Sequence, residues 1–234
     1  LKLFEARFKE KFLEKKLDRS EVARVEIRLL EALGEEGRGE FYDKVGAFLD
    51  VGQNHLLEML AILAMSRPKN LSAAEVSGKR AEILKTLKIL SRSEIKALTR
   101  RAQYQGYTKI KGVRPASRTE TYFKITAYLR EVRWRGIPIL LESGKRMPET
   151  RKEIVVYFKD GTFMRFPVET HKRTYQYVEE YKKIILDALG RDQRWFVGPE
   201  EVMAAWRFAD PIRKAWNRNL VPLKIYQPDI YPKV

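Results

Sequence analysis

The spacing of apolar residues assigns the first part of the chain to one helix and one strand. Residues 3–17 have helical spacing and many Lys and Glu side chains, whereas residues 24–30 alternate between apolar and charged side chains. Strict alternation is typical of a strand with one buried face. The pattern therefore predicts a helix followed by a strand, with Glu31 at the end of that strand.

A long apolar helix is predicted after a glycine-rich turn. From Val45 to Leu63 apolar residues recur at helical spacing until Pro68 ends the run, so His55 lies inside this helix. Ser72 is a suitable N-cap for a second amphipathic helix that begins at Ala73.

Further strands and helices are predicted in the second half. β-Branched and aromatic residues predict one long strand over residues 119–134, and a hairpin is predicted over residues 153–168 around Lys159-Asp160-Gly161. Helical spacing returns at residues 175–189 and 200–208. Strands and helices are segregated along the chain, which predicts an α+β fold with a mostly antiparallel sheet and helices packed on one face.

The length and the ends of the chain predict its domain organisation. With 234 residues, 44% of them hydrophobic, the chain can bury the core of one domain. We expect this domain to cover residues 1–225, followed by an extended proline-containing tail over residues 226–234. Because Leu1 opens directly onto an amphipathic stretch, we also expect the chain to be a fragment.

The composition narrows the class of partner. A net charge of +16 indicates an anionic partner, which could be a nucleic acid, a membrane surface or a phosphorylated metabolite. The basic residues are spread along the chain without a zinc-finger or RNA-recognition signature, which does not favour nucleic acid. The longest apolar stretch, residues 56–65, is too short to span a bilayer. The absence of cysteine excludes disulfides and thiolate catalysis and fits a cytoplasmic protein.

Nucleotide and metal motifs are absent from the sequence. The glycine cluster at residues 34–39 contains two Glu residues and lacks the spacing of a dinucleotide-binding turn, so no cofactor-binding residue is assigned. Ser143-Gly144-Lys145 lacks the spacing of a phosphate-binding loop, and Arg146 stands where that loop needs Ser or Thr. His55 and Glu58 could give a metal ion only two ligands, so no metal site is predicted.

Two residues in these segments are candidates for chemistry. Of the two histidines, His171 is interpreted as a surface residue, whereas His55 lies between polar neighbours and an apolar helix face. An imidazole in this position is either structural or a general base, and the residues alone leave both interpretations open. Lys145, in a turn after a strand, is either a solvated lysine or a contact for a phosphate or hydroxyl group.

A long motif around His55 provides a resemblance. The run from Gly34 to Asp43, together with Asp50-Val-Gly-Gln-Asn-His55-Leu-Leu, resembles the central motif of the glucose-6-phosphate dehydrogenase family. Similar short stretches follow in the same order. They are Gln103-Tyr104, Thr119-Glu120-Thr121, Arg133-Trp134-x-Gly136-x-Pro138, Gly144-Lys145-Arg146-Met147-Pro148, Ala204-Ala205-Trp206 and Asp210-Pro211-Ile212. The resemblance covers nearly the whole chain and implies the C-terminal, substrate-binding domain of that family without its NADP-binding domain.

The resemblance also implies the reaction and the roles of four residues. Glucose 6-phosphate would be oxidised at C1 to 6-phosphogluconolactone, a step of the oxidative pentose phosphate pathway, with NADP bound mainly by a domain outside this chain. His55 would remove the C1 hydroxyl proton, Glu31 and Asp50 would hold sugar hydroxyls, and Lys145 would contact the substrate. On a straight α-helix Asp50 and His55 would lie about 140° apart, so their convergence requires the substrate or a special helix geometry.

Departures from the family pattern qualify these expectations. Glu142 and Thr150 stand where the family commonly has basic residues, which affects the phosphate side of the site. Between Phe158 and Tyr175 the family normally has a longer set of strands, whereas this sequence has room for one hairpin. We therefore expect a smaller sheet, with less surface for a homodimer. The family's D-H-Y-L-G-K motif would lie upstream of residue 1, so the isolated chain is expected to be nearly inactive. The alternative is a non-catalytic basic module that binds sugar phosphates or nucleic acid.

Overall fold

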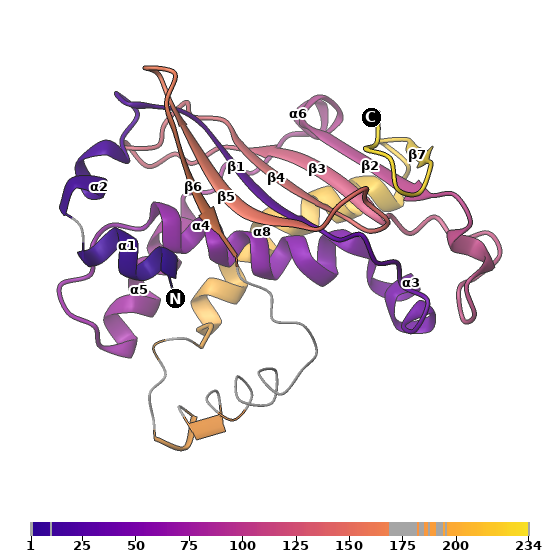
Figure 1. The fold of residues 1–234 in the computed structure, drawn as a ribbon, viewed down its shortest axis with the longest axis horizontal. Helices are drawn as coiled ribbons and strands as arrows, with labels where there is room; N and C mark the ends of the chain where they lie inside the picture. The colour runs from indigo at the N-terminus through magenta and orange to yellow at the C-terminus, as the bar shows by residue number, and fades with distance from the viewer. Residues whose placement is uncertain are drawn as a thin grey trace.

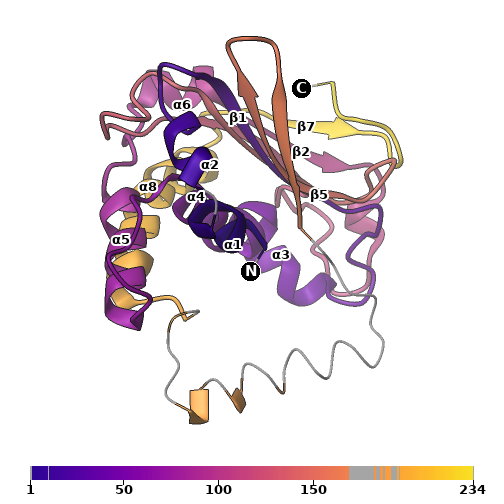
Figure 2. The same ribbon diagram turned by 60° about the vertical axis from the view of Figure 1, so that its left-hand side comes forward.

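A mixed sheet covered by helices forms the core of the computed structural model, which describes residues 2–9, 11–168, 182, 185–186, 188–190, 194 and 196–233. Figure 1 shows helices α4 and α8 running beneath the sheet, and Figure 2 shows α1, α4, α5 and α8 on the same side of it. The helical elements are α1 (Lys2–Lys9), α2 (Lys11–Lys16), α3 (Gly39–Ala47), η1 (Phe48–Leu56), α4 (Leu57–Ala64), α5 (Ala73–Lys85), α6 (Arg92–Leu98), η2 (Tyr107–Lys109) and α8 (Pro199–Asn217). The strands are β1 (Val22–Leu30), β2 (Thr99–Tyr104), β3 (Tyr122–Ala127), β4 (Ile139–Gly144), β5 (Arg151–Phe158), β6 (Phe163–Pro167) and β7 (Leu223–Tyr226).

The sheet has the strand order β6-β5-β1-β4-β3-β2-β7 in the part of the chain that the structure describes. Strand β1 lies near its middle, antiparallel to β5 and parallel to β4, and β2 and β7 are also parallel. The other pairings, β2 with β3, β3 with β4 and β5 with β6, are antiparallel. The expected α+β fold with a mostly antiparallel sheet and helices on one face is therefore confirmed.

The alternating pattern of the first predicted strand is explained by the two faces of the sheet. Val25 and Ile27 are fully buried, whereas Arg24 is exposed and Arg28 is half-buried on the opposite face. Helices cover only the first of these faces, as Figure 2 shows, so charged side chains occupy the other.

The predicted long helix is interrupted, and this expectation was wrong. Helix α3 ends at a bend where Gly46 has a φ of 74°, and the next nine residues, Phe48–Leu56, form the π-helix η1 before α4 resumes the α-helical path. Because only glycine readily adopts a positive φ, Gly46 allows the chain to change direction there. His55 lies in the π-helix rather than in a regular α-helix.

The predicted long strand over residues 119–134 was also too long. Strand β3 ends at Ala127, and a turn follows in which the Trp134 N–H donates to the Glu131 carbonyl at 3.1 Å. Trp134 is fully buried because it fills the core, where its indole Nε1 donates to the Ala64 carbonyl at 2.9 Å. The aromatic character of this stretch reflects burial of a turn and not continuation of the strand.

The other predicted elements follow the sequence pattern closely. Ser72 caps α5 by accepting the Glu75 N–H, and the hairpin of β5 and β6 turns at residues 159–162. Helix α8 is longer than predicted, because it continues through Pro211 to Asn217. After β7, residues 227–233 contain a turn, and the Asp229 N–H donates to the Arg146 carbonyl. His171 and most of the helix predicted over residues 175–189 lie outside the described residues.

Candidate functional site

The ends of β1 and β4 bring Glu31 and Lys145 together. The two strands are parallel and paired in register up to Leu30 and Gly144, and the Glu31 N–H donates to the Gly144 carbonyl at 2.9 Å. Since both strands end at the same edge, the next residue of each leaves the sheet beside the other. The Lys145 ammonium group forms an ion pair with Glu31 at this edge.

A row of alternating charges extends from this pair in both directions. Lys152 Nζ on β5 lies 2.7 Å from Glu31 Oε1, and Lys145 Nζ lies 2.7 Å from Glu35 Oε1. Arg38 then contacts Glu35 at 3.7 Å and Asp50 at 2.9 Å. The order along the row is Lys152, Glu31, Lys145, Glu35, Arg38 and Asp50. Neighbouring side chains in the row therefore carry opposite charges.

The two members of the central pair hold each other in the ionised form. Burial would raise the pKa of Glu31, but the ammonium groups of Lys145 and Lys152 outweigh it and lower the pKa to about 2. Burial would likewise lower the pKa of Lys145, yet the carboxylates of Glu31 and Glu35 raise it above its ordinary value. At neutral pH the edge of the sheet therefore presents a fixed carboxylate and a fixed ammonium group.

The π-helix relates Asp50 to His55. A π-helix bonds residue i to residue i+5, so residues five apart lie about one turn from each other on the same side. Asp50 and His55 are separated by five residues within η1, and the 140° separation of an α-helix does not arise. Helix geometry therefore places both residues on one side, and the Asp50 carboxylate is held by Arg38.

The His55 side chain is exposed. Within the described part of the chain its imidazole has no hydrogen-bond partner, whereas its backbone N–H donates to the Asn54 side chain at 2.5 Å. Asn54 in turn donates to the Asp50 carbonyl at 3.2 Å. The imidazole is therefore available to form a hydrogen bond with a group outside the described residues.

Glu142 and Thr150, the two departures from the family pattern, have internal roles. Glu142 accepts hydrogen bonds from Arg28 Nε at 3.0 Å and from the Tyr122 hydroxyl at 2.6 Å on the uncovered face of the sheet. Thr150 Oγ1 accepts the Ala32 N–H at 3.2 Å and so holds the residue next to Glu31. The Glu142 carboxylate is therefore occupied by Arg28 and Tyr122, whereas Thr150 stabilises the loop that follows Glu31.

Glu35 and Arg38 belong to the site, although the sequence did not single them out. Both lie inside the motif between Gly34 and Asp43, and Glu35 is only 3% exposed. A buried carboxylate needs a cation, and Glu35 is the group that joins the strand ends to the π-helix through Lys145 and Arg38. The signal in the sequence was that a carboxylate, Glu35, and a guanidinium group, Arg38, occur together in a glycine-rich loop.

The loop between β1 and α3 does not fit the pyrophosphate of a dinucleotide. The glycine-containing loop between β1 and α3 carries Glu35 and Glu36, which are paired with Lys145 and Arg146, so carboxylates stand where a pyrophosphate would need amides or cations. No group of three or more His, Asp or Glu side chains that could hold a metal ion occurs among the residues that the structure describes. Of the described helices, none combines the length and apolar character needed to cross a membrane.

Comparisons with known proteins agree with this geometry. A family model described as "Glucose-6-phosphate dehydrogenase, C-terminal domain" matches residues 4–177 and 160–233. A glucose-6-phosphate 1-dehydrogenase of Helicobacter pylori is 32% identical over 225 residues, covering 88% of this chain and 52% of that protein. The protein of the same name from Dickeya dadantii is 28% identical, covering 97% of this chain and 58% of that protein. The chain thus spans about half the length of these relatives.

Solved structures show the same fold. A glucose-6-phosphate 1-dehydrogenase from Mycobacterium avium superimposes with a TM-score of 0.79 at 27% identity, over 96% of this chain and 55% of that one. A glucose-6-phosphate dehydrogenase in complex with glucose 6-phosphate gives a TM-score of 0.82 at 24% identity, over 99% of this chain and 57% of that one. Sequence motif, family model and fold lead to one conclusion: this chain belongs to the glucose-6-phosphate dehydrogenase family, of which it matches the C-terminal domain.

Proposed function

We propose that this chain is the substrate-binding and proton-abstracting part of a glucose-6-phosphate dehydrogenase. The observation that carries the proposal is the row of alternating charges that joins Glu31, Lys145 and Asp50 and ends on the π-helix of His55. Carboxylates held in place by cations are good acceptors for sugar hydroxyls, and a buried lysine is a point charge for an oxygen of the substrate.

Each residue of the proposed site has a defined task. Glu31 and Asp50 accept hydroxyl groups of the sugar and fix the orientation of the ring, and Lys145 donates to a substrate oxygen. His55 takes the proton of the C1 hydroxyl, which its exposed imidazole can reach without breaking an existing bond. NADP is the proposed hydride acceptor, bound mainly by a domain outside this chain, and the product would enter the pentose phosphate pathway of the cytoplasm.

A fusion protein provides the test. The chain is joined to the N-terminal half of the Helicobacter pylori relative, and NADP reduction by glucose 6-phosphate is followed by absorbance. A general base contributes roughly 10²–10⁴-fold, so we expect His55→Asn to lower kcat by that factor with little change in KM. Asp50→Asn should instead raise KM, because it removes a hydroxyl acceptor.

The second histidine supplies the matched control. His171→Asn makes the same chemical change elsewhere in the chain and should leave kcat and KM near those of the unmodified fusion. A fusion that turns over glucose 6-phosphate equally fast with His55→Asn would refute the role of His55. A folded fusion with no activity on glucose 6-phosphate would refute the substrate.

A further inference from the structure

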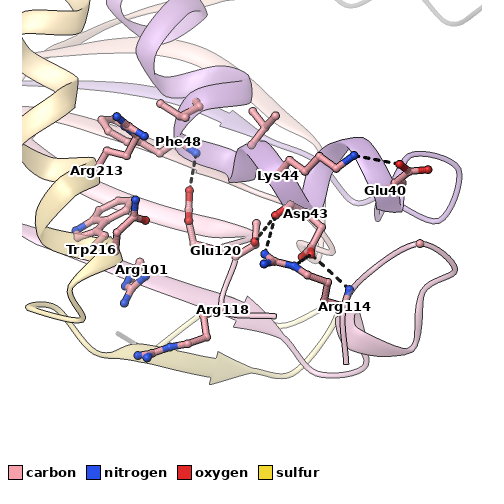
Figure 3. Close-up of a pocket in the computed structure, with 15 residues that line it drawn as sticks. Glu40, Asp43, Lys44, Phe48, Arg101, Arg114, Arg118, Glu120, Arg213 and Trp216 are labelled. Atoms are coloured by element: carbon pink, nitrogen blue, oxygen red, sulfur yellow. Dashed lines mark hydrogen bonds and ion pairs between the residues drawn. The ribbon is translucent and has the colours of Figure 1, made fainter. Parts of the chain in front are cut away.

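A buried carboxyl group lies at the beginning of the π-helix. Glu120, two residues before β3, is 9% exposed, and its Oε1 accepts the Phe48 N–H at 3.1 Å. Its backbone carbonyl accepts the Ala47 N–H at 3.0 Å, as a second contact to the same turn. Figure 3 shows the side chain of Glu120 pointing from the β3 segment towards Phe48. One residue therefore satisfies two N–H groups where α3 gives way to η1.

The bend at Gly46 is fitted to this carboxyl group. A Cβ atom at Gly46 would lie 2.5 Å from Glu120 Oε1, so an added side chain would force the Glu120 carboxyl group to move, and the φ of 74° already disfavours most other residues. The close approach of Glu120 and the change of direction at Gly46 thus depend on each other. Both features lie at the junction where α3 ends and η1 begins.

Glu120 is one of the residues that line a pocket of about 560 Å³. Charged groups from every surrounding element also line this pocket, namely Asp43 and Lys44 of α3, Arg101 of β2, Arg118 of the segment before β3, and Arg213 of α8. Burial raises the pKa of Glu120 to about 7, and the Phe48 N–H and the charge of Arg101 only partly oppose it. The group that caps the π-helix therefore changes charge near neutral pH.

We propose that Glu120 is a positioning residue, whose carboxyl group sets the first turn of the π-helix and thereby the relative placement of Asp50 and His55. The inference rests on the proposed function, because placement matters only if these two residues act on one substrate. Without the acceptor at Phe48, the chain can rewind towards an α-helix, in which Asp50 and His55 lie about 140° apart. Glu120 itself lies outside the row of alternating charges, and in the described part of the chain its hydrogen bond to the π-helix is with Phe48, the first residue of η1.

Nuclear magnetic resonance of the chain tests this placement without substrate. The chain has two histidines, so the Cε1–H signal of His55 is identified by its loss in His55→Asn. We expect Glu120→Ala to shift the His55 signal and the amide signals of residues 48–56. Glu120→Gln keeps an oxygen acceptor for Phe48 and should leave His55 near its original position, while it removes the change of the Phe48 amide signal with pH near 7.

Two further variants serve as a control and as a replacement for the alanine variant. Glu40→Gln removes an exposed carboxylate that lines the same pocket and pairs with Lys44, and it should shift neither His55 nor the amides of the π-helix. Glu120→Asp keeps the charge but shortens the reach to Phe48, so it should resemble Glu120→Ala and serves if the alanine variant does not fold.

Activity of the fusion protein separates positioning from simple stabilisation. Misplacement by about 1 Å can cost on the order of a hundredfold in rate, so Glu120→Ala should lower kcat by roughly tenfold to a hundredfold, with Glu120→Gln much closer to the unmodified fusion. A folded Glu120→Ala or Glu120→Asp chain with unshifted His55 and π-helix signals would overturn the inference. Failure of the unmodified fusion on glucose 6-phosphate would refute the proposed function but would leave the resonance test decisive for Glu120.

Discussion

At the scale of single residues, the balance of charge at the site depends on Lys145. Its side chain is 9% exposed and neutralises Glu31 and Glu35, and the Glu35 side chain is 2% exposed. Without Lys145, the buried Glu35 carboxylate would keep the contact with Arg38 at 3.7 Å, and removal of one member of a buried pair costs up to roughly 3–5 kcal/mol. We therefore expect Lys145→Met to lower the free energy of unfolding at pH 7 by about that amount, as measured by urea denaturation.

Lys152→Met is the matched control for this prediction. Among the described residues Lys152 forms an ion pair only with Glu31, which retains Lys145, so its loss should cost about 1 kcal/mol or less. Equal losses in the two variants would show that Glu35 does not depend on Lys145 for its charge.

The sequence could predict some of the site residues and not others. Glu31 and Lys145 each follow a strand, and the positions of strand ends can be read from apolar alternation and from glycine. Glu35 and Arg38 lie in an irregular loop, where no periodicity indicates which side chains turn inward. Glu35 is buried beside Lys145, and the more exposed Arg38 is held by Asp50, and both partners come from other parts of the chain.

At the scale of elements, the π-helix could not be predicted from apolar spacing. The buried residues of η1 are Phe48, Val51, Gly52 and Leu56, a spacing that an α-helix also produces over so short a stretch. The difference arises at Gly46 and from Glu120, which is 72 residues away from Phe48 in sequence. A contact between residues so far apart in sequence leaves no pattern in the sequence around the π-helix.

Two glycines in helices are expected to respond in opposite directions to substitution by alanine. Gly78 lies inside α5, and a Cβ there would meet no atom within 4 Å, so Gly78→Ala should stabilise the chain by roughly 0.5–1 kcal/mol. Gly46→Ala should destabilise it by roughly 1–3 kcal/mol, because of its positive φ and the contact with Glu120. Thermal unfolding of the two variants checks both signs, and stabilisation by Gly46→Ala would contradict the fitted bend.

A buried carboxylate cluster joins α4, α5 and α8 and makes their packing dependent on pH. Glu201 is fully buried, with Arg80 Nε 2.8 Å from Glu201 Oε2 and the Ser77 hydroxyl 2.7 Å from Glu201 Oε1. Burial, and then the charge of Glu201, raise the pKa of Glu58 from its ordinary value to about 7. The folded state thus binds a proton that the unfolded state releases.

The raised pKa of Glu58 determines how the stability of the chain changes with pH. With a folded pKa above the unfolded one, a carboxyl group contributes less stability as the pH rises from about 4.5 to about 7, and the loss is complete above that range. Gln resembles the protonated form, so Glu58→Gln should stabilise the chain by on the order of 1–3 kcal/mol at pH 8 and by little at pH 4.5. Urea denaturation at the two pH values measures the difference. A larger gain at the lower pH would contradict the assignment.

At the scale of the whole molecule, the fold class was predictable but one decisive pairing was not. Alternation and turn residues gave the α+β class, the first strand and the hairpin of β5 and β6. The parallel pairing of β1 with β4 joins residues more than a hundred positions apart, and the intervening helices and strands carry no signal for it. This pairing is what brings Glu31 beside Lys145, so the site depends on the least predictable feature of the topology.

The net charge of +16 should make the stability of the whole chain depend on salt. Repulsion among excess positive charges destabilises the compact state, and salt screens it over about 10 Å at 0.1 M. Exposed ion pairs such as that of Lys44 and Glu40 also weaken in salt, but each contributes little, so the long-range repulsion should dominate. We expect the melting temperature to rise when NaCl is increased from about 0.02 M to about 0.3 M. Each 1 kcal/mol of repulsion that salt removes should raise it by roughly 2–4 °C. Calorimetry of the exposed double variant Lys111→Gln/Lys224→Gln should give a higher melting temperature at low salt and a smaller rise, whereas a fall with salt in both proteins would show that ion pairs dominate.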